Sequence, residues 1–285
     1  MRTRFGPAGR PINYKGPTEN IPEYLRTEEG LDAFEYQAVR GVKISKDKAQ
    51  ILGENAKKFD VLLSLHAPYA INLASSSEST RKASVERLIR SLEAAKWMGA
   101  RIVVFHPGYY GKFSKEEALK LCIKMLKDAR ERADSLGFKE VFLGPETMGK
   151  LSQVGSLDEI ITMCESVPKT LPVIDWAHIH ARTKGGLKSK DDYLKVLSTI
   201  EDRLGSDVVK TLHCHFTKVE FSDKGERRHR RLDEGGFGPY FEQLATVIVE
   251  NGYSFTIISE SPVLDKDAIV MKRILEQILR TKQQT

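Results

Sequence analysis

Six short apolar runs in this sequence end in a histidine or an acid, and this repeat constrains the fold more than any other feature. Runs of four to eight apolar and β-branched residues bounded by turn signals are typical of buried parallel strands. Because parallel strands share one carboxyl edge, side chains at their ends are expected to meet there. The runs are residues 61–66, 102–106, 140–146, 171–178, 208–213 and 255–260, which deliver His66, His106, Glu146, Asp175 with His178, His213 and Glu260 respectively.

Helical patterns separate these runs. Weak strands at residues 3–5 and 30–37 complete eight strand and helix pairs, which predicts a single (β/α)8 barrel domain over residues 1–285 and disfavours an open doubly wound sheet. No GxGxxG follows the first strand, which disfavours a dinucleotide site. The expected helices span residues 18–28, 45–56, 78–98, 114–136, 190–203, 239–251 and 266–281, and a further helix begins at Ser156 and Asp158.

Composition narrows the class of protein. With 40% hydrophobic residues and no run approaching the ~20 apolar residues of a membrane span, a cytoplasmic protein is expected, and we expect a monomer. The three cysteines have no CxxC spacing, which disfavours a disulfide framework or a thiolate zinc site. A net charge of +6 is compatible with a polyanionic partner. The arginines of residues 224–231 are then either a solvated surface run or phosphate contacts.

The histidines indicate a metal site. Six of the seven lie at or just beyond expected strand ends, and none lies on an expected helix. One such histidine is more often structural, but several beside Glu146, Asp175 and Glu260 favour metal binding. Imidazole with carboxylate suits Zn²⁺, Mn²⁺ or Fe²⁺, and the lack of thiolates favours an open catalytic site.

Several motifs, in order along the chain, resemble those of the endonuclease IV type of AP endonucleases. They are LHAPYAINL at 65–73, FHPG at 105–108, PET at 145–147, IDWAH at 174–178, LH at 212–213, and HRRL at 229–232 ahead of EGGFG at 234–238. The resemblance implies a (β/α)8 barrel that uses two or three Zn²⁺ ions, with Mn²⁺ as an alternative, to cleave double-stranded DNA 5′ to abasic sites.

The resemblance also implies roles for individual residues. Glu146 would bridge two metals and Glu260 would lie close to the attacking water, so both are assigned catalytic roles. Tyr69 would insert into DNA, and Arg227, Arg228, Arg230 and Arg231 would contact phosphates. The implied ligand sets are His66, His106 and Glu146 for the first metal; Glu146, Asp175, His213 and Glu260 for the second; and His178 and His229 for the third.

One position departs from the family pattern. An aspartate two residues before the late histidine completes the third metal site in the family, and here that position is Arg227. A cation cannot replace an anionic ligand. Several alternatives are open. Glu226, Asp223 or Asp233 substitutes through a shifted loop, a water does so, the third site is weak or empty, or only two metals bind and the Arg227 guanidinium faces the scissile phosphate.

Two other function classes compete with a nuclease. A sugar isomerase or epimerase on the same barrel would use Glu146, Asp175, His213 and Glu260 as a one-metal site, but it leaves His66, His106 and His229 without a task. A basic DNA-binding barrel with reduced metal occupancy is the non-enzymatic alternative. Metal stoichiometry separates the classes, with one equivalent favouring the isomerase and two or three the nuclease.

Overall fold

Eight parallel strands close into a barrel in the computed structural model, which describes residues 2–284. Two four-stranded ladders, β1-β12-β9-β8 and β2-β3-β4-β6, are joined by bridges from Ala8 to Glu35 and from Glu146 to Val173. The predicted (β/α)8 barrel is therefore confirmed. The strands are β1 (Arg4–Pro7), β2 (Ala33–Gln37), β3 (Leu62–His66), β4 (Ile102–Phe105), β6 (Phe142–Pro145), β8 (Val173–Asp175), β9 (His213–Phe216) and β12 (Thr256–Ser259).

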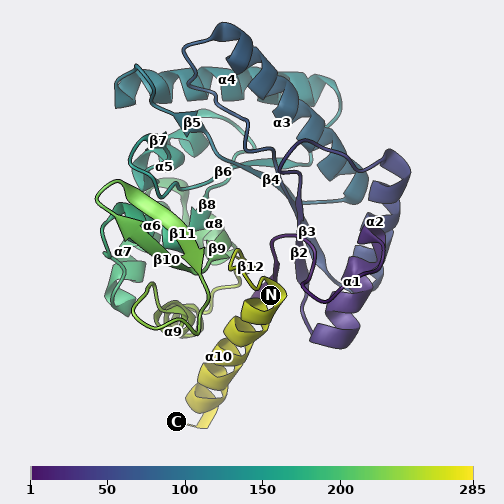
Figure 1. Cartoon of the computed structure of the whole chain (residues 1–285), viewed down its shortest axis with the longest axis vertical. Coiled ribbons are helices and arrows are strands. Elements are labelled where there is room, and N and C mark those ends of the chain that lie inside the picture. The colour runs from purple at the N-terminus through teal and green to yellow at the C-terminus, as the bar shows by residue number, and fades with distance from the viewer. Residues whose placement is uncertain (1, 285) are drawn as a thin grey trace.

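Helices surround the strands, with α3 and α4 along one side and α10 at the other in Figure 1. No helix among residues 2–284 is long and apolar enough to cross a membrane. The main helices are α2 (Lys46–Lys58), α3 (Glu78–Met98), α4 (Lys115–Ser135), α5 (Leu157–Ser166), α7 (Lys190–Leu204), α9 (Phe241–Asn251) and α10 (Asp265–Gln284). Shorter helical segments are η1 (Thr18–Asn20), α1 (Ile21–Tyr24), η2 (Leu25–Glu29), α6 (Trp176–Arg182) and α8 (Ser206–Lys210).

Local signals fix the helix ends where the sequence places them. Ser45 caps α2 by accepting from the Lys48 N–H, and Ser114 forms a capping box with Glu117 at the start of α4. Gly99 ends α3 in the left-handed conformation, with φ of 66°. These ends orient each helix so that the next strand enters the barrel.

The expected strand over residues 208–213 is wrong. Residues Ser206–Lys210 form α8, and the strand β9 begins only at His213. Val209 is fully buried in the core outside the barrel, and this packing outweighs the β-propensity of the two valines. Because side chains alternate along a strand, His213 and His215 both face the barrel interior, with His215 nearer the carboxyl edge.

Two further expectations are wrong. His178 and His180 lie on α6, because the Asp175 carboxylate caps that helix by accepting from the His178 N–H at 2.8 Å. The arginine-rich stretch is not a loop: β11 (Gly225–Arg230) pairs antiparallel with β10 (Lys218–Ser222). This hairpin lies in the foreground of Figure 1, in front of α6, which both of its strands contact. A second small pair, β5 (Gly108–Tyr109) with β7 (Gln153–Val154), borders the same end of the barrel.

The barrel interior is polar on one side and apolar on the other. Ile102, Val104 and Val173 form an apolar cluster of their own, separate from the core between strands and helices. Glu35 and His215, at 0% exposure, lie in the interior on the other strands. Burying such groups costs free energy unless they are paired, so their partners define the site.

Candidate metal centre

Metal-capable side chains meet at the carboxyl ends of the strands, around a cleft of about 330 Å³. Four groups have ligand atoms within 4.8 Å of one another: His66, His106 and Glu146; Glu146, Asp175, His215 and Glu260; Asp175, His178 and His229; and Glu35, His213 and His215. The first three groups share Glu146 or Asp175, so they make one continuous centre.

The first group is formed by the ends of β3, β4 and β6. His66 Nε2 lies 3.3 Å and His106 Nε2 lies 3.2 Å from Glu146 Oε2. His66 Nδ1 donates to the Ala67 carbonyl at 2.9 Å, which leaves Nε2 free as a ligand atom. The structure thus brings together the three residues that the sequence assigns to the first metal.

The second group contains His215, not His213. His215 Nδ1 lies 3.3 Å from Glu146 Oε1 and 3.3 Å from Glu260 Oε1. His213 lies two residues earlier on β9 and contacts Glu35 instead. The placement of His213 beside Glu146 and Glu260 is therefore wrong, because the strand expected to end at residue 213 begins there and ends at Phe216.

Glu146 is placed to bridge the first two groups. Its Oε2 faces His66 and His106, whereas its Oε1 faces His215 and His178, at 3.3 and 3.2 Å. Burial disfavours its charged form, yet the surrounding histidines, His215 foremost, hold the Glu146 pKa well below its usual range. Burial would lower the pKa of His66, but Glu146 outweighs it and raises that pKa to about 9. Protons and a bound cation therefore compete for these ligands.

Glu226 on the hairpin lies beside the third group. Its carboxylate lies 3.4 Å from His178 Nε2 and 3.6 Å from His229 Nε2. Arg227 points elsewhere: its side chain is 63% exposed and lies 3.3 Å from Glu220. Of the other two acids that the sequence offers, Asp223 pairs with Lys184, and Asp233 pairs with Arg231.

Two glycines let Glu226 approach His178. A Cβ on Gly149 would lie 2.7 Å from the Glu226 Cβ and 3.0 Å from the His178 Cδ2. Gly225 has φ of +94°, and a Cβ there would lie 2.2 Å from the Gly149 carbonyl oxygen. The Glu226 N–H donates to that same carbonyl at 3.2 Å. The hairpin is therefore docked through backbone contacts that exclude larger side chains.

The residues present fit a group of divalent ions. Asp175 Oδ2 and His229 Nε2 are buried and have no hydrogen-bond partner among the described residues, so both atoms are available as ligands. Burial raises the pKa of Asp175 to about 6, as expected for a carboxylate that lacks a compensating cation. Imidazole and carboxylate donors without thiolates suit Zn²⁺ or Mn²⁺.

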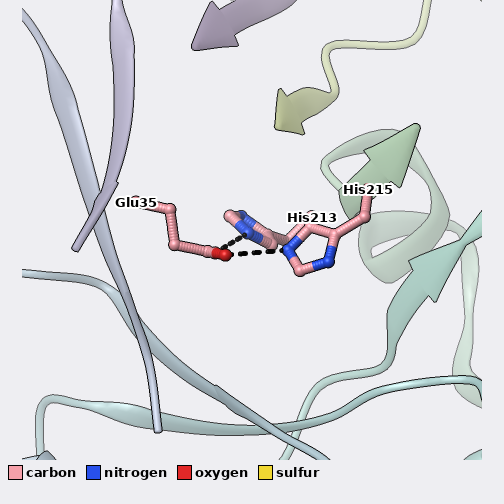
Figure 2. Close-up of side chains that lie close together, drawn as sticks. All are labelled: Glu35, His213 and His215. Atoms are coloured by element: carbon pink, nitrogen blue, oxygen red, sulfur yellow. Dashed lines mark hydrogen bonds and ion pairs between the residues drawn. The ribbon is translucent and has the colours of Figure 1, made fainter. Parts of the chain in front are cut away.

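Sequence reasoning missed Glu35. It lies inside β2 and not at the strand end, so the pattern of strand-terminal ligands does not include it. Its side chain is fully buried, and Oε2 accepts from His213 Nε2 at 3.0 Å, as Figure 2 shows. Burial opposes its ionisation, but His215 and His213 hold the Glu35 pKa well below its usual range. The sequence signal that could have found Glu35 is an acidic residue in the middle of an otherwise apolar strand.

The rim of the cleft carries exposed aromatic side chains. Tyr69 is 58% exposed and Tyr109 is 44% exposed, and both line the cleft with Lys150. Tyr109 was not among the residues singled out from sequence. Arg228 is 64% exposed, whereas Arg230 is mostly buried against Glu220, Glu234 and the Phe237 ring.

Comparison with known sequences supports one family. The family described as Xylose isomerase-like TIM barrel matches residues 26–277. An uncharacterized protein of Methanocaldococcus jannaschii is 33% identical over 274 residues, which cover 96% of this chain and 97% of that protein. A probable endonuclease 4 of Mycoplasmopsis synoviae is 26% identical over 274 residues, covering 93% and 89% of the two chains.

Solved structures of two function classes share the fold. Endonuclease IV from Thermus thermophilus superposes with a TM-score of 0.71 at 22% identity, over 98% of this chain and 99% of that one. A D-tagatose 3-epimerase-like protein superposes with a TM-score of 0.67 at 22% identity, over 89% and 90%. At these identities the likeness extends to the fold alone, so substrate class must be argued from the site.

Proposed function

The chain belongs to the Xylose isomerase-like TIM barrel family, and on that premise we propose that it is a metal-dependent phosphodiesterase that cleaves DNA 5′ to abasic sites. The observation that carries the proposal is the surplus of ligands. Beyond the group of Glu146, Asp175, His215 and Glu260, the centre holds His66 and His106 on one side. It holds His178, His229 and Glu226 on the other.

Hydrolysis of a phosphodiester uses such an arrangement. Clustered divalent ions supply Lewis acidity at the phosphate oxygens and lower the pKa of water. Glu146 sets the spacing within the centre, since each of its oxygens faces a different pair of histidines. Glu260 lies at the cleft with its side chain 17% exposed, and we assign it the task of accepting the proton of the attacking water.

The rim suits a nucleic acid. Exposed Tyr69 and Tyr109 can stack on bases or fill the gap at an abasic nucleotide. Lys150 in the cleft and the exposed Arg228 and Arg231 can contact backbone phosphates, which carry no sequence information. We therefore propose double-stranded DNA as the partner, bound with little sequence preference.

A sugar epimerase is the second candidate. The group of Glu146, Asp175, His215 and Glu260 would by itself make a one-metal site for moving a proton between adjacent sugar carbons, and the epimerase-like fold neighbour favours it. A one-metal epimerase site assigns no role to His66, His106, His229 or Glu226.

One experiment separates the candidates. Protein replete with Zn²⁺ or Mn²⁺ is assayed on a duplex with one abasic site, on the intact duplex, and on ketohexoses. We expect incision 5′ to the abasic site, two or three metal equivalents, and no epimerisation. Glu260→Gln should slow incision by about 10²- to 10⁴-fold, the range for loss of a general base, at unchanged thermal stability. Epimerisation with one metal equivalent would reject the phosphodiesterase.

A further inference from the structure

A buried carboxylate lies directly behind the metal centre. Glu35 comes from the middle of β2, where its register partner on β3 is Ser64, and it is 0% exposed. It does not line the cleft, and it is not in the three groups that share Glu146 or Asp175. Burying a charged carboxylate costs free energy unless hydrogen-bond donors surround it, so the partners of Glu35 indicate its role.

Donors face both oxygens of Glu35. Its Oε2 accepts from Ser64 Oγ at 2.8 Å and from His213 Nε2 at 3.0 Å. Its Oε1 accepts from Gln37 Nε2 at 3.1 Å and lies 3.0 Å from His215 Nε2, as in Figure 2. The last contact is at ion-pair distance, but its angle does not meet the geometry of a hydrogen bond.

His215 therefore has two different sides. Its Nδ1 faces Glu146 and Glu260 in the centre, and its Nε2 faces Glu35. A neutral imidazole binds a metal through one nitrogen and carries its proton on the other. A carboxylate at the protonated nitrogen fixes the tautomer and makes the ring a stronger donor to the metal.

Three other ligand histidines direct a ring nitrogen to a backbone carbonyl. His66 Nδ1 donates to the Ala67 carbonyl at 2.9 Å, and His178 Nδ1 lies 2.8 Å from the Thr147 carbonyl. His229 Nδ1 lies 3.0 Å from the Glu260 carbonyl. His178 Nδ1 also lies 3.2 Å from Glu146 and 3.5 Å from Asp175, but these carboxylates belong to the centre itself. His215 differs because the carboxylate at its second nitrogen, that of Glu35, lies behind the centre and away from the cleft.

We propose that Glu35 is a positioning residue of the metal centre, which orients His215 and strengthens its binding to the ion shared with Glu146, Asp175 and Glu260. His213 then acts one step further out, by holding Glu35 from the opposite side of the barrel. The inference rests on metal binding by the proposed function's site, and not on its substrate.

A rival arrangement is a separate metal site made of Glu35, His213 and His215. Their ligand atoms lie within 4.8 Å of one another. Such a site requires His215 to bind ions through both ring nitrogens, with neither carrying a proton. The oxygens of Glu35 already accept from Ser64 and Gln37 as well. Geometry thus favours the positioning role.

The test measures metal binding in Glu35→Gln, with Ser64→Ala as the control that removes one donor and keeps the charge. Co²⁺-loaded protein gives a visible spectrum, and chelator competition with Zn²⁺ gives the affinities. We expect Glu35→Gln to weaken one ion by about 10- to 100-fold, to change the Co²⁺ spectrum, and to leave stoichiometry at saturating metal unchanged. Ser64→Ala should shift the affinity much less.

Two results would overturn the inference. One is an unchanged affinity and spectrum in folded Glu35→Gln. The other is the loss of one whole equivalent with the remaining affinities unchanged, which indicates a separate ion. If Glu35→Gln does not fold, His213→Gln is tested for the same weakening. Wild-type protein that binds metal without cleaving DNA rejects the phosphodiesterase proposal alone, because this test does not depend on cleavage.

Discussion

The two halves of the candidate centre differ in how the chain holds them. Glu146, Asp175 and His215 lie at or next to barrel strands and are 0% exposed. Glu226 and His229 belong to the β10–β11 hairpin, with side chains 16% and 19% exposed. A parallel ladder fixes the first half from both sides, whereas the second depends on one hairpin that is docked against residues 149–151 and packs on α6. Substitutions in the barrel half should therefore abolish metal binding and activity, whereas substitutions in the hairpin half should reduce them.

Removing the bridging charge should have the largest effect. Glu146→Gln removes the negative charge and replaces one of the two oxygens by an NH2 group that cannot bind a cation, so we expect loss of at least one metal equivalent. Incision should fall by roughly a thousandfold or more, since Lewis acidity contributes several kcal/mol and about 1.4 kcal/mol is tenfold. Elemental analysis and single-turnover incision measure the two effects, with exposed Glu131→Gln as the control. Retained metal and rate would remove Glu146 from the centre.

The hairpin half is tested by two neighbours on β11. Glu226→Ala removes the carboxylate beside His178 and His229, so we expect one metal equivalent fewer and incision slower by about a hundredfold, as for loss of one group that stabilises transition-state charge. Arg227→Ala is the matched control and should keep the metal, because its side chain points to Glu220.

The opposite outcome has a clear meaning. If Arg227→Ala slows incision at constant metal while Glu226→Ala is silent, the guanidinium serves the phosphate and the centre holds two ions. Zinc-edge anomalous scattering on crystals of replete protein would count the ions directly.

The same division explains what the sequence could predict. The barrel follows from strand runs ending in His66, His106, Glu146 and Asp175, because a period of two and a shared edge determine where those side chains lie. His213 was assigned in place of His215 because burial of Val209 in α8 delays the start of β9, and apolar composition does not reveal such packing. The choice of Glu226 depends on hairpin register and on the bulge between Glu220 and Phe221, which are tertiary features.

The docking of the hairpin can be weakened without touching a ligand. A Cβ on Gly149 would crowd Glu226 and His178, so Gly149→Ala should shift the hairpin and weaken the third ion by about tenfold, given overpacking costs of about 1–3 kcal/mol. Gly235→Ala is the matched control, because a Cβ there would have no atom within 4 Å. Titration of apo protein with Zn²⁺ measures the change. Equal affinities in the two variants would show that the close approach of Gly149 to Glu226 does not position the third ion's ligands.

The smallest effect should come from the outer face of the hairpin. Arg228 and Arg231 are 64% and 48% exposed, and they can leave their carboxylate partners for DNA phosphates. Arg228→Ala with Arg231→Ala should lower the salt dependence of duplex binding by about one unit of log–log slope per lost phosphate contact, without changing metal content. Arg230→Ala serves as the contrast: it packs on Phe237 and pairs with Glu234, so its loss should lower thermal stability more than the slope. Duplex binding measured across salt concentrations tests whether these arginines contact phosphates. An unchanged slope in the double variant would mean that they are a solvated surface run. DNA contact would then rest on Tyr69, Tyr109 and Lys150 at the cleft.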